Sequence, residues 1–212
     1  MVALAVSDAP AAPHPSPGLV GPNAVIQLRH ALVEGAAPGE AARVFALAGQ
    51  SAHFERPPEA MIDETIPAAL FAALWRALPE RDAARLARDA GERTADYVMT
   101  HRIPAFARAL LRNLPRGLAA RLLLRAIARN AWTFAGSGRC EVETGTRLAI
   151  VIHDNTLATP GCVWHAGVFT RLFDRLVAPG TSVIHTACTR RGDALCRFEI
   201  ALNPKTRRTR TR

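Results

Sequence analysis

The sequence predicts an α+β protein in which a helical layer packs on one antiparallel sheet of about five strands. Two observations lead to this prediction. Apolar residues recur at intervals of three and four through most of the chain before Ala131. After that residue the pattern changes to short alternating segments separated by turn residues, with one further helical stretch. Hydrophobic residues make up 49% of the 212 residues, which is enough for a single core of ordinary size.

The helical part divides into six predicted segments. Each has an apolar stripe and is bounded by Gly, Pro or polar residues of the kinds that begin and end helices. The segments are 23–34, 40–48, 66–78, 81–102, a helix that restarts at Pro104, and 116–130. The stretch 53–58 is predicted to be a break.

The strands are predicted from alternating or β-branched residues between Gly-rich turns. They are 132–135, 139–143, 147–153, 181–188 and 195–202. The last two are joined by the turn Arg190-Arg191-Gly192-Asp193 and form a predicted hairpin, which follows a predicted helix at 163–177. Gly136-x-Gly138 does not predict a nucleotide-binding loop, because no third glycine follows at the required spacing and a strand comes next.

Residues 23–202 are predicted to form one domain. Residues 1–22 are rich in Ala, Pro and Gly without periodicity, and are expected to be a disordered leader rather than a secretory signal. The formal net charge is +9, and five of the positive charges lie in the last eight residues, so 203–212 is expected to be a disordered basic tail. No apolar run reaches the roughly 18 residues that a membrane span needs, so the expected location is cytoplasmic.

Arg121, Arg125 and Arg129 recur every four residues and form a basic ridge on the helix predicted at 116–130. A solvated helix face is one interpretation, and peripheral contact with an anionic membrane or an acidic partner is the other. Nucleic-acid binding is not expected, because the arginines lack interleaved aromatic residues and no zinc-finger or helix-turn-helix spacing occurs.

Three of the four cysteines and His185 lie in the last quarter of the chain. Cys162 is placed at the start of the helix 163–177, where the helix dipole favours a thiolate. Folding of the hairpin brings Cys188 and Cys196 together, with His185 just upstream. Because thiolates and neutral imidazole are tetrahedral zinc ligands, these four residues are candidates for a closed, structural Cys3His zinc site. A Cys188–Cys196 disulfide and ordinary buried cysteines are the alternatives.

The same region carries a family resemblance. The pattern Cys162…Gly167…Phe169, then Cys188-x-x-x-Gly192-x-x-x-Cys196-x-Phe198-x-Ile200, resembles the C-terminal half of the 4-vinyl reductase domain. This domain is similar in fold to the Bet-type subunits of a transport-particle tethering complex, so the resemblance implies a Bet-like ligand-binding fold. In the related sensor modules of transcription activators, zinc is bound by a cysteine at a helix start, an acidic residue and two hairpin cysteines. In this chain His185 stands where the acidic ligand is usual.

Over about residues 40–202 the chain looks most like the family member that is encoded with genes of bacteriochlorophyll biosynthesis. The resemblance implies a tetrapyrrole-binding accessory or carrier protein, which handles Mg-porphyrin or divinyl protochlorophyllide intermediates together with the enzymes of Mg-tetrapyrrole synthesis. The alternative is a reductase of a ring vinyl group on divinyl (proto)chlorophyllide. The carrier is favoured because the sequence has no dinucleotide fingerprint or flavin signature, so no nucleotide cofactor is predicted. A homodimer at the inner face of the photosynthetic membrane is expected from the same resemblance.

A closed zinc site would leave the pigment to bind elsewhere, between the sheet and the long helices. Imidazole can fill the axial position of a magnesium porphyrin, aromatic rings can cover its face, and Arg102 and Arg108 can pair with its carboxylates. The candidate pigment-binding residues are Tyr97, His101, Trp132, His153, Trp164 and His165. Packing in the core is the alternative for each of them.

Overall fold

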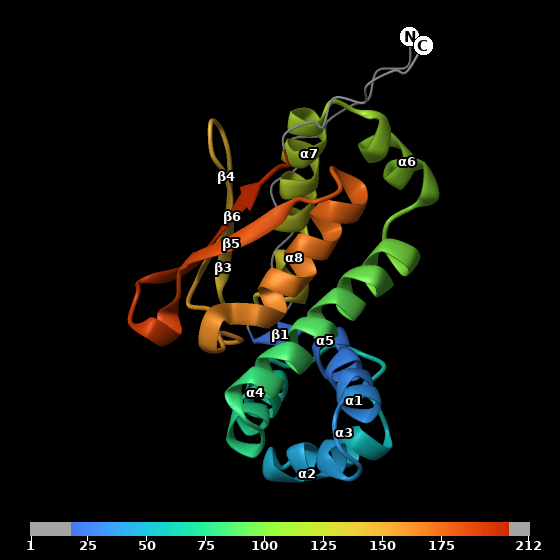
Figure 1. Ribbon diagram of the computed structural model, residues 1–212, viewed down its shortest axis with the longest axis vertical. Helices are drawn as coiled ribbons and strands as arrows, with labels where there is room; N and C mark the ends of the chain where they lie inside the picture. The colour runs from blue at the N-terminus through green and yellow to red at the C-terminus, as the bar shows by residue number, and fades with distance from the viewer. Residues whose placement is uncertain (1–17, 204–212) are drawn as a thin grey trace.

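A computed structural model describes residues 18–203 of the protein, and these form eight α-helices and six strands (Figure 1). The helices are α1 (Asn23–Gly35), α2 (Glu40–Leu47), α3 (Ser51–Glu55), α4 (Thr65–Ala77), α5 (Glu80–His101), α6 (Ala105–Asn113), α7 (Arg116–Arg129) and α8 (Val163–Leu176). The strands are β1 (Leu19–Val20), β2 (Ile62–Asp63), β3 (Arg139–Thr144), β4 (Leu148–His153), β5 (Ser182–Ala187) and β6 (Leu195–Ala201). The predicted α+β class is confirmed.

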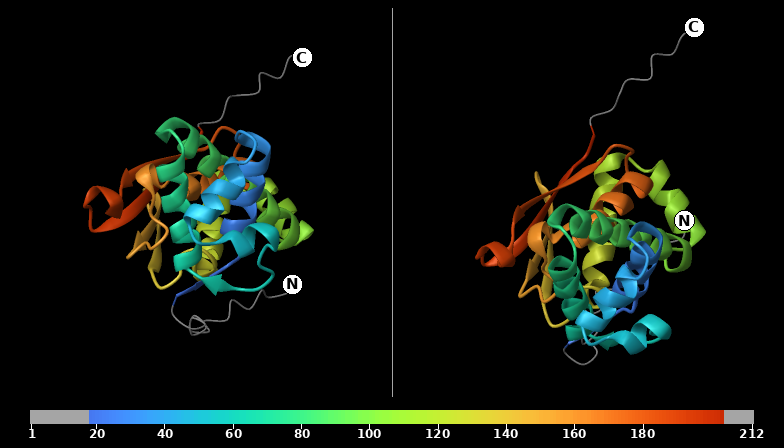
Figure 2. Two further views of the ribbon diagram at one scale, coloured as in Figure 1. Left: turned by 90° about the horizontal axis from the view of Figure 1, so that it is seen from below. Right: turned by 60° about the horizontal axis from the view of Figure 1, so that its bottom comes forward.

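The main sheet is antiparallel, with the strand order β3-β4-β6-β5, and a separate pair is formed by β1 and β2. α7 and α8 lie against one face of the main sheet, and α5 crosses α8 on its far side (Figures 1 and 2). α1 packs in turn on α5. The molecule is therefore layered, and α8 fills the space between the sheet and the longest helix.

The crossing of α5 and α8 depends on two glycines. A Cβ atom on Gly91 would lie 2.3 Å from the backbone oxygen of Trp164, and one on Gly167 would lie 2.7 Å from the backbone oxygen of Arg88. Both distances are shorter than any stable contact between such atoms, so only glycine allows the two backbones to approach this closely. This close approach leaves no room for a flat ligand between α5 and α8 at the crossing.

The sheet has four strands where the sequence predicted about five. The predicted strand at 132–135 is instead occupied by the short 3-10 turn η1 (Ala131–Thr133). The amide of Thr133 donates to the oxygen of Asn130 and that of Ala135 to the oxygen of Ala131, so these backbone groups are satisfied within the turn. The predicted break at 53–58 begins inside the short helix α3.

A buried carboxylate connects three distant segments. Glu64, between β2 and α4, is 9% exposed. Its Oε1 accepts from the hydroxyl of Ser137 at 2.6 Å. Its Oε2 accepts from the amide of Ser137 at 2.8 Å and from the hydroxyl of Thr156 at 2.9 Å. The carboxylate thereby joins the helical part of the chain to the loops that flank β3 and β4.

The chain enters and leaves the fold at defined places. β1 pairs with β2, and at the other end Arg116 Nη1 donates to the backbone oxygen of Asn203 at 2.9 Å. Most of the predicted leader 1–22 and basic tail 203–212 lies outside the described residues. Within residues 18–203, no helix has the length and apolar character that crossing a membrane requires.

Candidate metal centre

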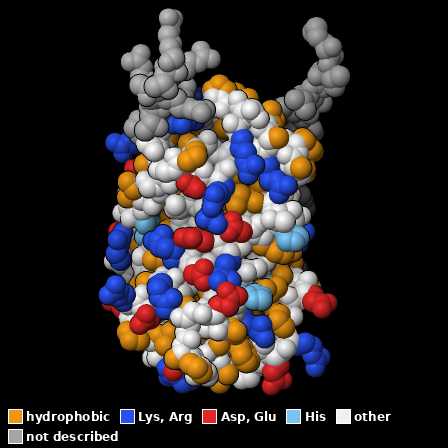
Figure 3. All heavy atoms as spheres, turned by 45° about the vertical axis from the view of Figure 1, so that its right-hand side comes forward, with side chains coloured by type: hydrophobic (Ala, Val, Ile, Leu, Met, Phe, Trp, Pro, Cys, Tyr) orange, Lys and Arg blue, Asp and Glu red, His pale blue; other side chains and the backbone are white. Residues whose placement is uncertain are grey.

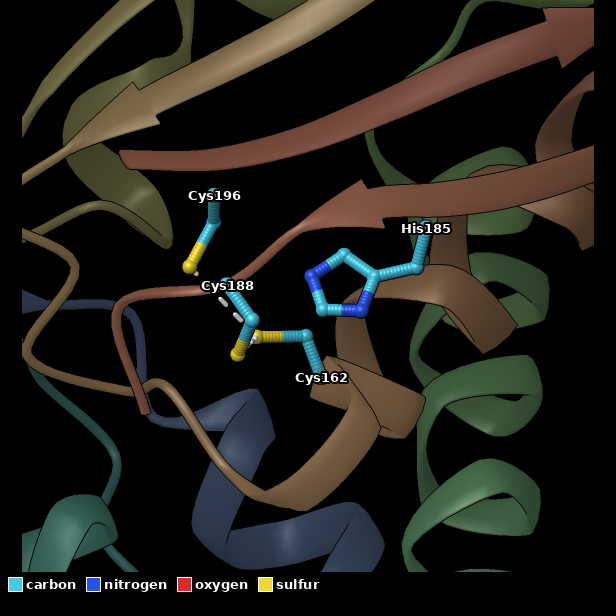
Figure 4. A group of neighbouring side chains, drawn as sticks. All are labelled: Cys162, His185, Cys188 and Cys196. Atoms are coloured by element: carbon cyan, nitrogen blue, oxygen red, sulfur yellow. Dashed lines mark hydrogen bonds between the residues drawn. The ribbon is translucent and has the colours of Figure 1, made fainter. Parts of the chain in front are cut away.

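The four cysteine and histidine side chains predicted as zinc ligands converge at one place. The ligand atoms of Cys162, His185, Cys188 and Cys196 all lie within 4.8 Å of one another (Figure 4). The sulfur of Cys162 is 3.6 Å from each of the other two sulfurs. Sulfurs bound to one tetrahedral zinc ion at about 2.3 Å would be about 3.8 Å apart, so the cluster has dimensions close to those of a metal site. The four residues therefore form a cluster that could hold a metal ion.

The imidazole of His185 completes the set from β5. Its ring points toward the three sulfur atoms in Figure 4, and its Nε2 is buried without a hydrogen-bond partner. A buried ring nitrogen without a partner is costly, unless a ligand that the protein atoms do not supply occupies its lone pair. A metal ion bound by the sulfurs would provide that ligand.

Local backbone geometry directs the side chains of two of the cysteines toward the cluster. Cys162 caps the start of α8 with φ 43° and ψ 40°, a left-handed conformation that residues other than glycine rarely adopt, and it follows Gly161 at φ 68°. Cys188 lies just after β5, and its amide donates to Asp193 Oδ2 at 2.6 Å. Gly192, at φ 90°, closes the hairpin turn between Cys188 and Cys196. The strained Cys162 and the tight turn both place sulfur atoms in the cluster.

Hydrogen bonding within the cluster lowers the pKa of one thiol and raises that of another. The thiol of Cys162 donates to Cys196, which holds the pKa of Cys196 well below its ordinary value, and the hydrogen bond with Thr189 contributes in the same direction. The same bond, together with burial, raises the pKa of Cys162. The protein therefore stabilises one thiolate even before a cation is added, and a bound cation would favour deprotonation of the others.

All four cysteines are free thiols, so the predicted alternative of a Cys188–Cys196 disulfide is not present in the structure. The fourth cysteine, Cys140 on β3, is outside the cluster. Burial raises the pKa of its thiol to about 12, so it stays protonated and unreactive at neutral pH.

The six candidate pigment-binding residues are distributed over several places. Tyr97 and His101 stack on each other near the end of α5, with ring centroids 4.4 Å apart. Trp132 is half-buried in η1. His153, on β4, has its Nε2 3.5 Å from Glu141 Oε2 on β3. The structure therefore brings together only the first pair and, on α8, the second pair Trp164 and His165.

Trp164 and His165 are core residues. Their rings are 4.8 Å apart, and the two side chains are 3% and 1% exposed. Both nitrogens of His165 lack partners, and its ring is surrounded by Phe134, Phe169 and Phe198. Burial lowers the pKa of His165 to about 4, so it is neutral at physiological pH.

His101 differs from His165 because it is exposed. Its Nδ1 lies 3.0 Å from the backbone oxygen of Tyr97. This bond requires the proton on Nδ1, which leaves the lone pair of Nε2 available for a metal or a hydrogen-bond donor. Arg108 donates to the backbone oxygen of Met99, whereas Arg102 is exposed.

Among the hollows on the surface of the described residues are two shallow ones. One, of about 620 Å³, lies between α5 and the start of α8 and is lined by Arg81, Arg85, Arg88 and Val163 among others. The other, of about 340 Å³, lies at the end of the sheet beside Arg147. Neither is lined by any of the six candidate pigment-binding residues.

The cluster lies in a recognisable domain. Residues 155–202 match the model of the 4-vinyl reductase domain family, and this range contains α8, the β5–β6 hairpin and all four cluster residues. The match confirms the resemblance that the cysteine and glycine pattern indicated. The protein is thus an α+β protein whose C-terminal part is a domain of this class and carries a Cys/His cluster.

Similarity over nearly the whole chain defines the family more closely. The chain is 44% identical over 187 residues to the "Bacteriochlorophyll synthase 23 kDa chain" of Cereibacter sphaeroides, which covers 85% of this chain and 89% of that protein. It is 39% identical over 209 residues to the protein of the same description from Rhodobacter capsulatus, covering 96% of both. The chain belongs to this family of 23 kDa chains.

The fold also has a similar solved structure outside the family. An H-NOX protein from S. oneidensis, described in the Fe(II)NO ligation state, matches with a TM-score of 0.51 at 9% sequence identity. The match covers 87% of this chain and 100% of that chain. At so low an identity the similarity concerns the fold alone.

Proposed function

We propose that this chain is a tetrapyrrole-binding accessory or carrier protein of bacteriochlorophyll biosynthesis. The observation that carries the proposal is the similarity, over nearly the whole chain, to relatives described as one chain of a bacteriochlorophyll synthase. In this role the protein, as a homodimer in the cytoplasm at the inner face of the photosynthetic membrane, presents a Mg-porphyrin or divinyl protochlorophyllide to the enzymes of Mg-tetrapyrrole synthesis.

The Cys/His cluster is proposed to hold one zinc ion. The donor set of Cys162, His185, Cys188 and Cys196 and the buried, unpartnered Nε2 support this assignment. Zinc bound there would have four protein ligands and no open position, so its role is structural. The ligands would join the start of α8 to the β5–β6 hairpin, which holds the helix against the sheet.

The pigment is proposed to bind outside the zinc cluster, through Tyr97 and His101. The imidazole of His101 is exposed, and its proton is held on Nδ1, so Nε2 is suited to the axial position of a magnesium ion. Arg102, the next residue, is an exposed cation that can pair with a propionate. The other four candidates lie elsewhere in the fold, in η1, on β4 and in the core part of α8.

The test is a titration of the full-length protein with magnesium protoporphyrin monomethyl ester and with divinyl protochlorophyllide, followed at the Soret band. We expect a saturable shift, and an affinity at least about tenfold lower for His101→Ala, because an axial ligand contributes more than an ordinary hydrogen bond. His30→Ala is the matched control, since His30 is an exposed histidine on α1. Equal affinities for the two variants would reject His101 as the ligand.

Adding NADPH or reduced ferredoxin to the complex separates the carrier from the reductase. A carrier leaves the bound pigment unchanged. Conversion of the divinyl to the monovinyl pigment would establish the reductase instead, and the absence of any Soret shift with either pigment would reject both.

A further inference from the structure

The corner formed by α6 and α7 has an unusual surface. α6 has no fully buried residue, although its sequence includes a phenylalanine and two leucines. Phe106 is 76% exposed and Leu110, one helical turn further, is 51% exposed. Leu118, at the start of α7, is 45% exposed. Half of the six large apolar side chains that are exposed within residues 18–203 therefore lie at this one corner. We refer to Phe106, Leu110 and Leu118 as the apolar corner.

The stretch of sequence that contains the apolar corner carries charge of one sign. From Tyr97 to Cys140 the sequence contains eight arginines and no Asp or Glu. Leu118, Arg121, Arg125 and Arg129 are all exposed and follow one another at helical intervals along one face of α7. Figure 3 turns the side of Figure 1 on which α6 lies toward the viewer, and its upper part shows hydrophobic and basic side chains together while most acidic ones lie lower.

Arg139 pairs with Glu141, but the other seven arginines of this region form no salt bridge with a carboxylate of the described residues. Four of them donate instead to backbone carbonyl oxygens, namely Arg108 to Met99, Arg112 to Arg175, Arg116 to Asn203 and Arg121 to Thr144. Elsewhere, Arg93, Arg171 and Arg197 each pair with acidic side chains. The α6–α7 corner thus keeps its positive charge, and a long stretch of positive charge attracts an anionic partner.

The end of the described chain lies at the same corner. Arg116, the first residue of α7, holds the backbone oxygen of Asn203 at 2.9 Å. The basic helix α7 therefore begins beside the last described residue of the chain.

We infer that the α6–α7 corner binds the surface of an anionic lipid bilayer. An amphipathic helix at the headgroup level inserts its apolar face shallowly, while flanking cations interact with anionic headgroups. Phe106 and Leu110 supply the inserted face, and the arginines of α7 supply the cations. An acidic protein would use the cations but would leave the highly exposed Phe106 without a role, so the lipid surface fits both features. This inference does not depend on pigment binding.

The test is co-sedimentation of the full-length protein with vesicles of phosphatidylcholine alone and of equal parts phosphatidylcholine and phosphatidylglycerol. We expect binding to the anionic vesicles only, and its loss in 1 M salt, where the screening length falls to about 3 Å. Phe106→Ser/Leu110→Ser should weaken this binding by about tenfold or more. The matched control is Val33→Ser/Leu47→Ser, which removes apolar side chains that are 54% and 49% exposed on α1 and α2.

Charge reversal tests the electrostatic part. Arg125→Glu/Arg129→Glu should weaken binding to anionic vesicles at least about tenfold, since each cation near an anionic surface contributes about fivefold. Arg81→Glu/Arg88→Glu, which reverses two exposed charges on α5, is the control.

Insertion itself is measured with Phe106→Trp. Its fluorescence should shift to shorter wavelength and be quenched by brominated lipid on binding, whereas that of Val33→Trp should not change. Three results would overturn the inference: no binding to anionic vesicles, equal binding to neutral vesicles, or unchanged binding by Phe106→Ser/Leu110→Ser. If that variant instead disrupts a dimer in sedimentation velocity and leaves vesicle binding intact, the apolar corner is an interface between two copies of the chain.

Discussion

Glu64 and the Cys/His cluster are two groups of polar side chains that each join distant segments of the chain, but they differ in how their polar atoms are satisfied. Both oxygens of Glu64 accept hydrogen bonds, and all three donors come from the protein. In the cluster, His185 Nε2 is buried without a partner, and the sulfurs contact mainly one another. The protein itself satisfies the buried carboxylate of Glu64, whereas the buried Nε2 of His185 beside three sulfur atoms leaves a place for a metal ligand.

The largest expected effect comes from breaking the cluster. Cys188→Ser should abolish metal binding and destabilise the protein by several kcal/mol, because the binding free energy of a structural zinc ion contributes directly to folding. Elemental analysis of protein purified without chelator should find about one zinc per chain in the wild type and none in the variant. Thermal unfolding measures the loss of stability.

Cys140→Ser is the control for that substitution, since Cys140 is a free thiol outside the cluster. It should retain both metal and stability. A wild-type protein that contains no metal, or a Cys188→Ser variant as stable as the wild type, would contradict the assignment of a structural zinc site. The cluster would then be a group of buried side chains that needs no ligand, as Glu64 is.

The next effect concerns pH. Burial lowers the pKa of His165 to about 4 in the folded protein, against about 6.5 in an unfolded chain. Between these two pH values the unfolded chain binds more protons, so the free energy of unfolding decreases as the pH falls from about 6.5 to about 4. The full loss is about 3 kcal/mol at 1.36 kcal/mol per pH unit.

The measurement is urea unfolding at several pH values for the wild type and for His165→Phe, which keeps the aromatic packing but cannot be protonated. Protonation of the cluster thiolates contributes to both proteins, so the difference between their pH slopes isolates His165. Parallel pH curves would show that His165 is not buried as a neutral imidazole.

A smaller effect is expected from Glu64→Ala. The substitution leaves the amide and hydroxyl of Ser137 and the hydroxyl of Thr156 without their acceptor, which should cost about 2 kcal/mol. Metal content should not change, and this distinguishes the scaffold group from the ligand-binding one. Glu59→Ala, at an exposed position just upstream, should be close to neutral.

The smallest effect is expected from Thr156→Val, which removes one of the three hydrogen bonds to Glu64 while keeping the side-chain shape. Denaturant unfolding should show a loss of about 1 kcal/mol or less, because Thr156 is exposed and the remaining donors still satisfy both carboxylate oxygens. A loss as large as that of Glu64→Ala would mean that the carboxylate depends on this single contact.

Much of the candidate metal centre was accessible from the sequence. The helix predicted at 163–177 is observed at Val163–Leu176, and the predicted strands of the hairpin contain Ser182–Ala187 and Leu195–Ala201. Both are set by local signals, namely apolar periodicity and turn residues. A hairpin turn places the residues on either side of it close together. The proximity of Cys188 and Cys196 therefore follows from their positions in the sequence. The approach of Cys162 needed only one helix to pack on the same sheet.

Contacts between segments far apart in the sequence could not be predicted in this way. Glu64 accepts hydrogen bonds from Ser137 and Thr156, which are 73 and 92 residues further along the chain. The apolar periodicity of the sequence does not predict contacts at such separations. The same holds for Phe106 and Leu110, because the sequence predicted a helix that restarts at Pro104 but did not indicate that these two side chains are exposed.

The sequence by itself determined the longer helices, the hairpin and the identity of the four cluster residues, because these depend on neighbours within a few turns of the chain. Only the tertiary structure decided that α8 lies between the sheet and α5, that His165 is enclosed by aromatic rings while His101 faces solvent, and that the apolar corner is exposed. The physical reason is that burial depends on which elements pack together. An amphipathic pattern indicates that a helix has an apolar face, but it does not say which other element covers that face.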